Sequence, residues 1–246
     1  MRVAPWICSS LTTTIRSPKR AVVSSDVAHS RREVTMQPDV QLSEPITRSS
    51  TPAGSVAEQW VRIAAWLHSH LSPVTIACAT PAQIADGAES TGTTWPPELI
   101  EFYEQINGFP SEEFVRLLPG RELFDLERVV QEREMELDVY AETNEIEEYE
   151  PPEGTTAGTA VFTYTPEFIP FAGLDGYLLF VDTRPGDLYG CVTEFDKVNA
   201  DDAGPRWVSL SAMLTDLADS LETSSKFDKY WKPTVVDGQL DWKYAP

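Results

Sequence analysis

Residues 168–192 constrain the fold of this chain more than any other stretch. Their centre, Y-L-L-F-V-D at 177–182, is a short apolar run between turn-forming residues, which is typical of a buried strand. Similar runs lie at 168–171 and 190–195, and the connections are too short for crossover helices. We therefore expect three adjacent antiparallel strands. Pro170 predicts that the first is an edge strand, because proline cannot donate to a central ladder.

Helices are predicted before and after these strands in the sequence. Apolar residues recur at helical spacing in four segments, and a capping-box pattern with proline at the first helical position predicts a further, short helix. The predicted helix starts are Ser55, Thr80, Pro96, Asp125 and Ser209.

Two shorter features complete the expected order of elements. Residues 114–118 are compatible with a strand, and Asp237-Gly238 between apolar residues predicts a terminal hairpin. Helices followed by antiparallel strands, a helix and a hairpin indicate an α+β domain with an antiparallel central sheet, over residues 56–246.

The charge of the chain excludes several classes of partner. Its 246 residues carry a formal charge of −20, but residues 1–55 hold seven Lys/Arg against four Asp/Glu, which leaves −23 for the remainder. Repulsion from phosphate argues against nucleic acid and against an anionic membrane as partners. No apolar run approaches the roughly 18 residues of a membrane span. Three scattered cysteines indicate a reducing, cytoplasmic environment.

Residues 1–55 form a segment of different character. They are rich in Ser, Thr, Pro and Arg and have no sustained apolar period, which predicts a disordered N-terminal extension. The segment is compatible with an organellar transit peptide, or with an upstream start that precedes a natural one at Met36.

The acidic residues concentrate in one tract. Residues 122–153 hold thirteen Asp/Glu against two Lys/Arg, and their end, within 142–159, has few apolar residues and a Pro-Pro pair. We expect 142–159 to be a solvated acidic insertion. The tract is either a solvated surface or a surface that steers a basic partner into contact.

The sequence contains no complete catalytic or metal-binding set, so we expect a non-enzyme without cofactor or metal. The two histidines of the first helix, His68 and His70, are two residues apart and point to different faces. Cys191 lies in an apolar strand, where a buried, inert thiol is expected. Several carboxylates surround the central strands and are interpreted as a solvated rim rather than a glycosidase or metal site: Asp175, Asp182, Asp187, Glu194 and Asp196.

An ordered set of motifs resembles the SUKH superfamily, which includes the Smi/Knr-type regulators of fungal cell-wall assembly and many bacterial immunity proteins. After a helix that contains Trp60, the motifs are W-P-P-E-L-I-E-F-Y-E-Q-I-N-G at 95–108, L-L-P at 117–119, I-P-F-A at 169–172, L-F-V-D at 179–182 and Y-G-C-V at 189–192. An amphipathic helix at 209–222 follows. The chain departs from the family pattern at Gly173–Tyr177 and at Cys191, where glutamine is common.

The resemblance implies a protein-binding module. In one alternative, the chain is a bacterial immunity protein that binds and neutralises a basic, nuclease-type toxin domain. In the other, it is a Smi/Knr-type regulatory scaffold in cell-wall assembly or signalling. Under either alternative, the expected contacts with the protein partner are the exposed acids Glu145, Glu147, Glu148, Glu150, Asp175 and Asp187.

Overall fold

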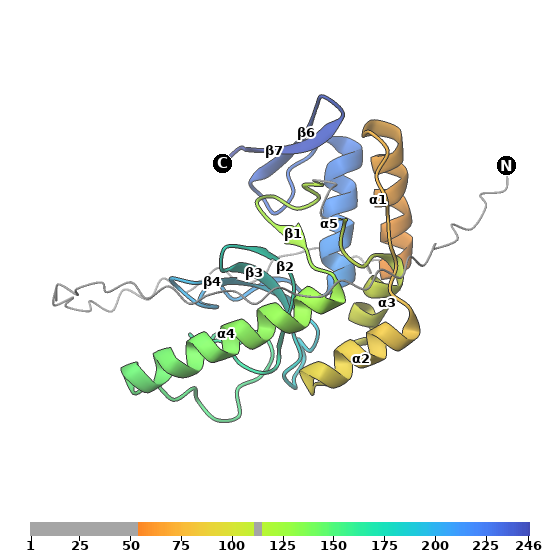
Figure 1. Ribbon diagram of the computed structural model, residues 1–246. Helices are drawn as coiled ribbons and strands as arrows, with labels where there is room; N and C mark the ends of the chain where they lie inside the picture. Colours follow the sequence, from red (N-terminus) through yellow and green to blue (C-terminus); the bar gives the residue numbers. More distant parts are fainter. Residues whose placement is uncertain (1–53, 111–114) are drawn as a thin grey trace, which may run out of the picture.

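The computed structural model describes residues 54–110 and 115–246, which fold around a single hydrophobic core that runs from Val56 to Leu240 (Figure 1). The prediction for 1–55 falls almost wholly outside the described residues. The elements are α1 (Val56–His70), α2 (Pro81–Thr91), α3 (Pro97–Gln105), β1 (Glu122–Leu123), α4 (Leu126–Glu147), β2 (Phe168–Leu174), β3 (Tyr177–Asp182), β4 (Val192–Asp196), β5 (Pro205–Trp207), α5 (Leu210–Thr223), β6 (Trp231–Val236) and β7 (Gln239–Tyr244).

The helices begin where their capping residues predict. Ser55 Oγ accepts a hydrogen bond from Glu58 N, and the Glu58 carboxylate accepts one from Ser55 N, so the two residues form a capping box. Thr80 forms the same arrangement at α2. The side chains of Asp125 and Ser209 accept the first free N–H groups of α4 and α5. These local contacts confirm the predicted starts.

The central sheet is antiparallel throughout, in the order β1-β2-β3-β4-β5, which confirms the predicted α+β architecture. The prediction that β2 is an edge strand is wrong, because β1 pairs with it. The two residues of β1 reach only Ala172 and Gly173, however, so β1 never requires an N–H from Pro170. The ladder between β2 and β3 also shifts register between Pro170 and Ala172.

The strand expected at 114–118 is not formed by its described part. Phe114 lies outside the described residues, and Leu117 and Leu118 are buried in an irregular segment. Leu118 makes only an isolated bridge to Arg121 across a turn, and pairing with the sheet begins at Glu122. These two leucines are therefore apolar because they fill the core, and strand pairing is not the reason.

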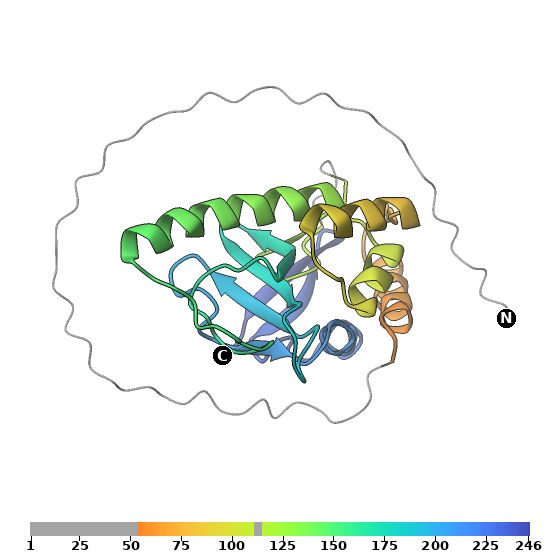
Figure 2. The same cartoon turned by 90° about the horizontal axis from the view of Figure 1, so that it is seen from below.

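Helices cover both faces of the sheet. α4 crosses one face (Figure 2). Its Tyr140 ring meets Phe195 edge-on there, at a centroid distance of 5.1 Å. On the opposite face, Phe102 of α3 meets Phe171 at 5.8 Å. α1 and α5 lie side by side beyond α3 (Figure 1).

The terminal hairpin forms as predicted. β6 and β7 pair from Trp231↔Tyr244 to Val236↔Gln239, and the turn residues Asp237 and Gly238 both have positive φ, 51° and 74°. The hairpin is docked at its tip, where Ser72 N donates to Gly238 O at 2.9 Å. Within the described residues, no helix combines the length and apolar content needed to cross a bilayer.

The prediction of a solvated acidic insertion at 142–159 is partly wrong. Its first six residues continue α4 to Glu147, and only the remainder is irregular. Glutamate and alanine are good helix formers, so the helix continues without an apolar face to bury. Low apolar content therefore marked the end of core packing, whereas the helix itself extends further.

Candidate interaction surface

The C-terminal part of α4 projects past the sheet. The buried residues of α4 end at Glu136, and the partly buried Leu137 and Tyr140 still pack against the core. The C-terminal turns of α4 extend away from the strands (Figure 1). Its last turns therefore present most of their side chains to solvent.

This projecting end carries four of the predicted partner-binding acids: Glu145, Glu147, Glu148 and Glu150, here called the acidic tip. All four are exposed, and none forms an ion pair with a described residue. Some acids elsewhere are paired; Asp219 and Glu222, for example, both form ion pairs with Arg62. The acidic tip is thus a local excess of unneutralised negative charge.

Two side chains fix the acidic tip to the segment that precedes β2. Asn144 Nδ2 donates to Thr163 Oγ1 at 2.8 Å, and the Tyr149 hydroxyl donates to Val161 O at 2.6 Å. Between them, Glu148 ends the helix in the left-handed conformation (φ 53°), and Tyr149 N donates to Asn144 O. The tip is therefore held in place although its outer surface packs against nothing described.

Asp201 supports the same segment from the other side. Its carboxylate is almost fully buried and accepts hydrogen bonds from Val161 N and from Phe162 N, the latter at 2.7 Å. Burial raises the pKa of Asp201, and the two N–H donors oppose that shift. Sequence analysis missed this residue, because nothing local links Asp201 to a segment forty residues earlier.

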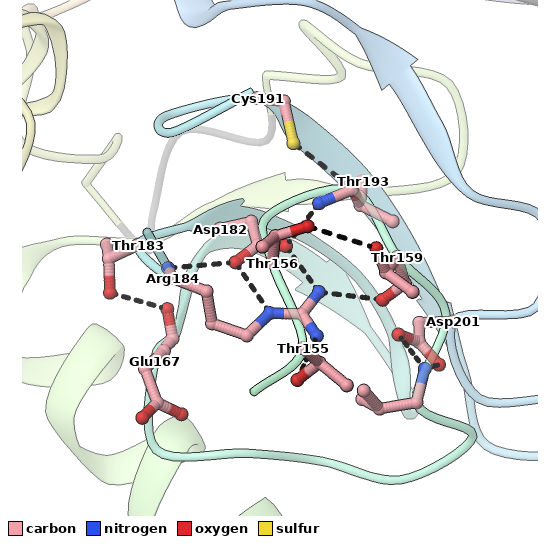
Figure 3. A network of polar contacts seen from close by, with 12 residues as sticks. Thr155, Thr156, Thr159, Glu167, Asp182, Thr183, Arg184, Cys191, Thr193 and Asp201 are labelled. Carbon is pink, nitrogen blue, oxygen red and sulfur yellow. Dashed lines mark hydrogen bonds and ion pairs between the residues drawn. The ribbon is translucent and has the colours of Figure 1, made fainter. Parts of the chain in front are cut away.

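A buried ion pair fastens residues 155–159 to the end of β3 (Figure 3). Arg184 donates from Nε and Nη2 to the two oxygens of Asp182, at 3.0 and 2.6 Å. Arg184 also donates to Thr159 O, and Gly158 N donates to Asp182 Oδ2. Asp182 is fully buried, so its assignment to a solvated rim is wrong.

The remaining predicted site residues do not form one surface with each other. Asp175 is exposed in the turn before β3 and forms an ion pair with Lys197 at 3.1 Å. Asp187 is exposed in the loop after β3. β3 has six residues, so these two acids lie about 20 Å apart, at opposite ends of the strand.

The structure also places the candidate metal ligands and the candidate nucleophile of the sequence analysis. No three His, Cys, Asp or Glu of the described ranges lie close enough to hold a metal ion. Glu194 lies on the face of the sheet opposite that of its neighbour Phe195, where it is half-buried between Arg121 and Arg206. Cys191 is buried as expected, and burial, together with Asp182, raises the pKa of its thiol to about 12. The ring of His70 stacks on Trp66 at 4.5 Å.

A groove of about 740 Å³ lies elsewhere, between the β1 segment and the terminal hairpin. Phe109, Trp231 and Trp242 contribute to its walls. Its charged lining is largely neutralised by ion pairs, Arg116 with Asp241 and Arg128 with Glu122. We assign no ligand to this groove.

One buried acid of α4 leads to a prediction about pH. Glu136 faces the sheet with 5% exposure, and burial, reinforced by Glu132, raises its pKa. Its ionised form therefore weakens the fold, so Glu136→Gln should raise the melting temperature at pH 7. Protonated Glu136 makes its full contribution to wild-type stability below the pKa that it has in the unfolded chain. This contribution is lost as the pH rises through the higher pKa that it has in the folded protein.

The advantage of Glu136→Gln should consequently shrink as the pH is lowered toward 4. Thermal unfolding followed by circular dichroism between pH 4 and 8 measures this. The matched control is Glu134→Gln, an exposed position on the same helix. Parallel stability profiles for the two variants would contradict the prediction.

Comparison with known proteins places this arrangement in a family. The model of the SMI1/KNR4 family (SUKH-1) matches residues 78–222, which extend from before α2 to the end of α5 and include α4, the whole central sheet and the acidic tip. α1 and the terminal hairpin lie outside the matched residues. No curated protein matches the chain. The resemblance read from the motifs is therefore confirmed, and the chain belongs to the SMI1/KNR4 family (SUKH-1).

Proposed function

We propose that this protein acts by stoichiometric binding, without chemistry of its own, and that it neutralises a basic, nuclease-type toxin domain by capturing it on the acidic tip. Domains of its family generally mediate protein–protein interactions. The observation that carries the proposal is the cluster of four exposed glutamates that no described cation neutralises.

Electrostatics supports a basic partner. A domain that binds nucleic acid presents cations to phosphate groups. Carboxylates held on a projecting helix end offer such cations an alternative anionic surface, and the overall charge of −20 attracts them over a longer range. The expected result is faster association of the pair, followed by occlusion of the surface that would have met nucleic acid.

Neutralising the acidic tip should slow capture. In the variant with glutamine at Glu145, Glu147, Glu148 and Glu150, we expect the association rate at low salt to fall by about tenfold or more, with a smaller change in dissociation. Added salt should lower the wild-type rate, because screening shortens the attraction to about 10 Å at 0.1 M. The measurement is surface plasmon resonance at several salt concentrations, with the purified product of an adjacent effector gene as the partner.

A matched control separates local from overall charge. The variant Asp86→Asn, Glu89→Gln, Glu104→Gln, Asp202→Asn removes the same charge from exposed positions elsewhere. It should retain most of the association rate. Equal losses of association rate in the two variants would show that the acidic tip acts only through its share of the net charge. Absence of binding and of protection against the effector would overturn the immunity role and favour a regulatory scaffold.

A further inference from the structure

Phe162 is an aromatic residue displayed to solvent in a strained conformation. Its side chain is 60% exposed, and its φ of 54° lies in the left-handed region that bulky residues seldom adopt. Packing of the ring against the described residues cannot explain either property. Such outliers persist only where the surrounding structure enforces them, and they cluster at functional sites.

The contacts on both sides of Phe162 enforce this conformation. Val161 and Thr163 are buried, at 0% and 1% exposure, so the chain turns inward immediately before and after the exposed ring. Asp201 holds the intervening peptide by accepting from Val161 N and Phe162 N. The aromatic side chain therefore projects from a backbone that is fixed at three consecutive residues.

Phe162 also lies beside the acidic tip. Its two neighbours in the chain are the residues that bind the end of α4, Thr163 through Asn144 and Val161 through Tyr149. Ile146, at 75% exposure, adds a second exposed apolar side chain between Glu145 and Glu147. Apolar contact area thus adjoins unneutralised carboxylates, which is the composition of an interface with an apolar centre and a charged rim.

We propose that Phe162 is the apolar anchor of the partner-binding surface, and that the acidic tip forms the rim beside it. The occupant is a basic protein surface on which lysines and arginines surround an apolar patch that covers the ring. Charge complementarity with the four glutamates selects this occupant, and a pre-positioned aromatic ring loses little conformational freedom on binding. The proposal rests on the proposed function and adds to it a requirement for apolar contact.

Phe162→Gly separates binding from stability. Glycine adopts positive φ without strain, so this variant should melt at the same temperature as the wild type or above it. It should nevertheless lose affinity, because it removes the anchor while leaving all four glutamates in place. Val61→Ala, which trims another exposed apolar side chain (58%) on α1, is the control and should leave binding unchanged.

The probes are two synthetic helical peptides of equal length and equal lysine content, one with leucine and one with glutamine at the centre of the face that carries the lysines. Fluorescence anisotropy at low salt measures their affinities for the full chain. We expect the wild type to bind the lysine–leucine peptide about tenfold more tightly than the lysine–glutamine peptide. Phe162→Gly should abolish this preference and retain the weaker, charge-dependent binding.

The outcomes distinguish the two proposals. A preference for leucine that survives in Phe162→Gly, or no preference in the wild type, overturns the anchor. If binding of both peptides is unaffected by the four glutamine substitutions and by salt, the acidic capture proposed above fails. Loss of the leucine preference in Phe162→Gly, with salt-dependent binding intact, supports both.

Discussion

Replacing Asp182 by alanine should lower the free energy of unfolding by about 3–5 kcal/mol, the usual cost of removing one partner from a buried ion pair. Asp182 and Arg184 are 0% and 4% exposed, so the guanidinium left behind would stay in a poorly solvated site. Gly158 N would also lose its acceptor. Urea or guanidinium denaturation of the variant measures the change.

Two further variants test that reason. Asp182→Ala combined with Arg184→Met should cost less than Asp182→Ala alone, because no unpaired charge remains buried. Asp187→Ala, at the exposed acid five residues later, should change stability by no more than about 0.5 kcal/mol. If Asp182→Ala and Asp187→Ala had similar effects, the buried ion pair would not stabilise the fold.

The features that sequence predicted well depend on neighbouring residues. Ser55 with Glu58, and Thr80 with Gln83, form capping boxes within three residues, so the helix starts were visible in the sequence. The same holds for the turn at Asp237-Gly238, whose two residues tolerate positive φ. Short turns between 168 and 195 likewise determined the antiparallel pairing of β2, β3 and β4.

The errors concern contacts between distant residues. β2 was expected at an edge because Pro170 cannot donate, but the two-residue β1 pairs with it beyond that proline. The end of α4 was expected to be a loop because it lacks apolar residues, and its attachment through Asn144 to Thr163 has no local signal. Asp182 was assigned to a solvated rim because the chain is so acidic, although its partner Arg184 lies only two residues later.

The candidate surface was predictable only in its charge. The density of acids in 122–153 pointed to Glu145 and its neighbours, whereas Phe162 carries no pattern that predicts positive φ for an aromatic residue. One usable signal was Asp182-Thr183-Arg184 at a strand end, since side chains two apart in an extended chain lie on the same side. No comparable signal connects Asp201 with Phe162.

Replacing Phe180 by alanine should cost about 3–5 kcal/mol, as expected for a large cavity in a packed core. Phe180 is fully buried in the central strand β3 and stacks on Phe168 with ring centroids 3.9 Å apart. Its neighbours in the ladder, Pro170 and Thr193, belong to paired strands that cannot readily move inward to fill the space. The melting temperature should fall by roughly 6–20 °C for a domain of this size.

Phe162→Ala is the matched control, because it removes the same atoms from a largely exposed position and should change stability by no more than about 0.5 kcal/mol. Chemical denaturation should therefore show a much lower midpoint for Phe180→Ala, with an unchanged slope, and a wild-type midpoint for Phe162→Ala. Equal midpoints for the two variants would contradict the placement of both rings. The pair of variants thus tests the core at Phe180 and the exposed anchor at Phe162 in one comparison, independently of any partner.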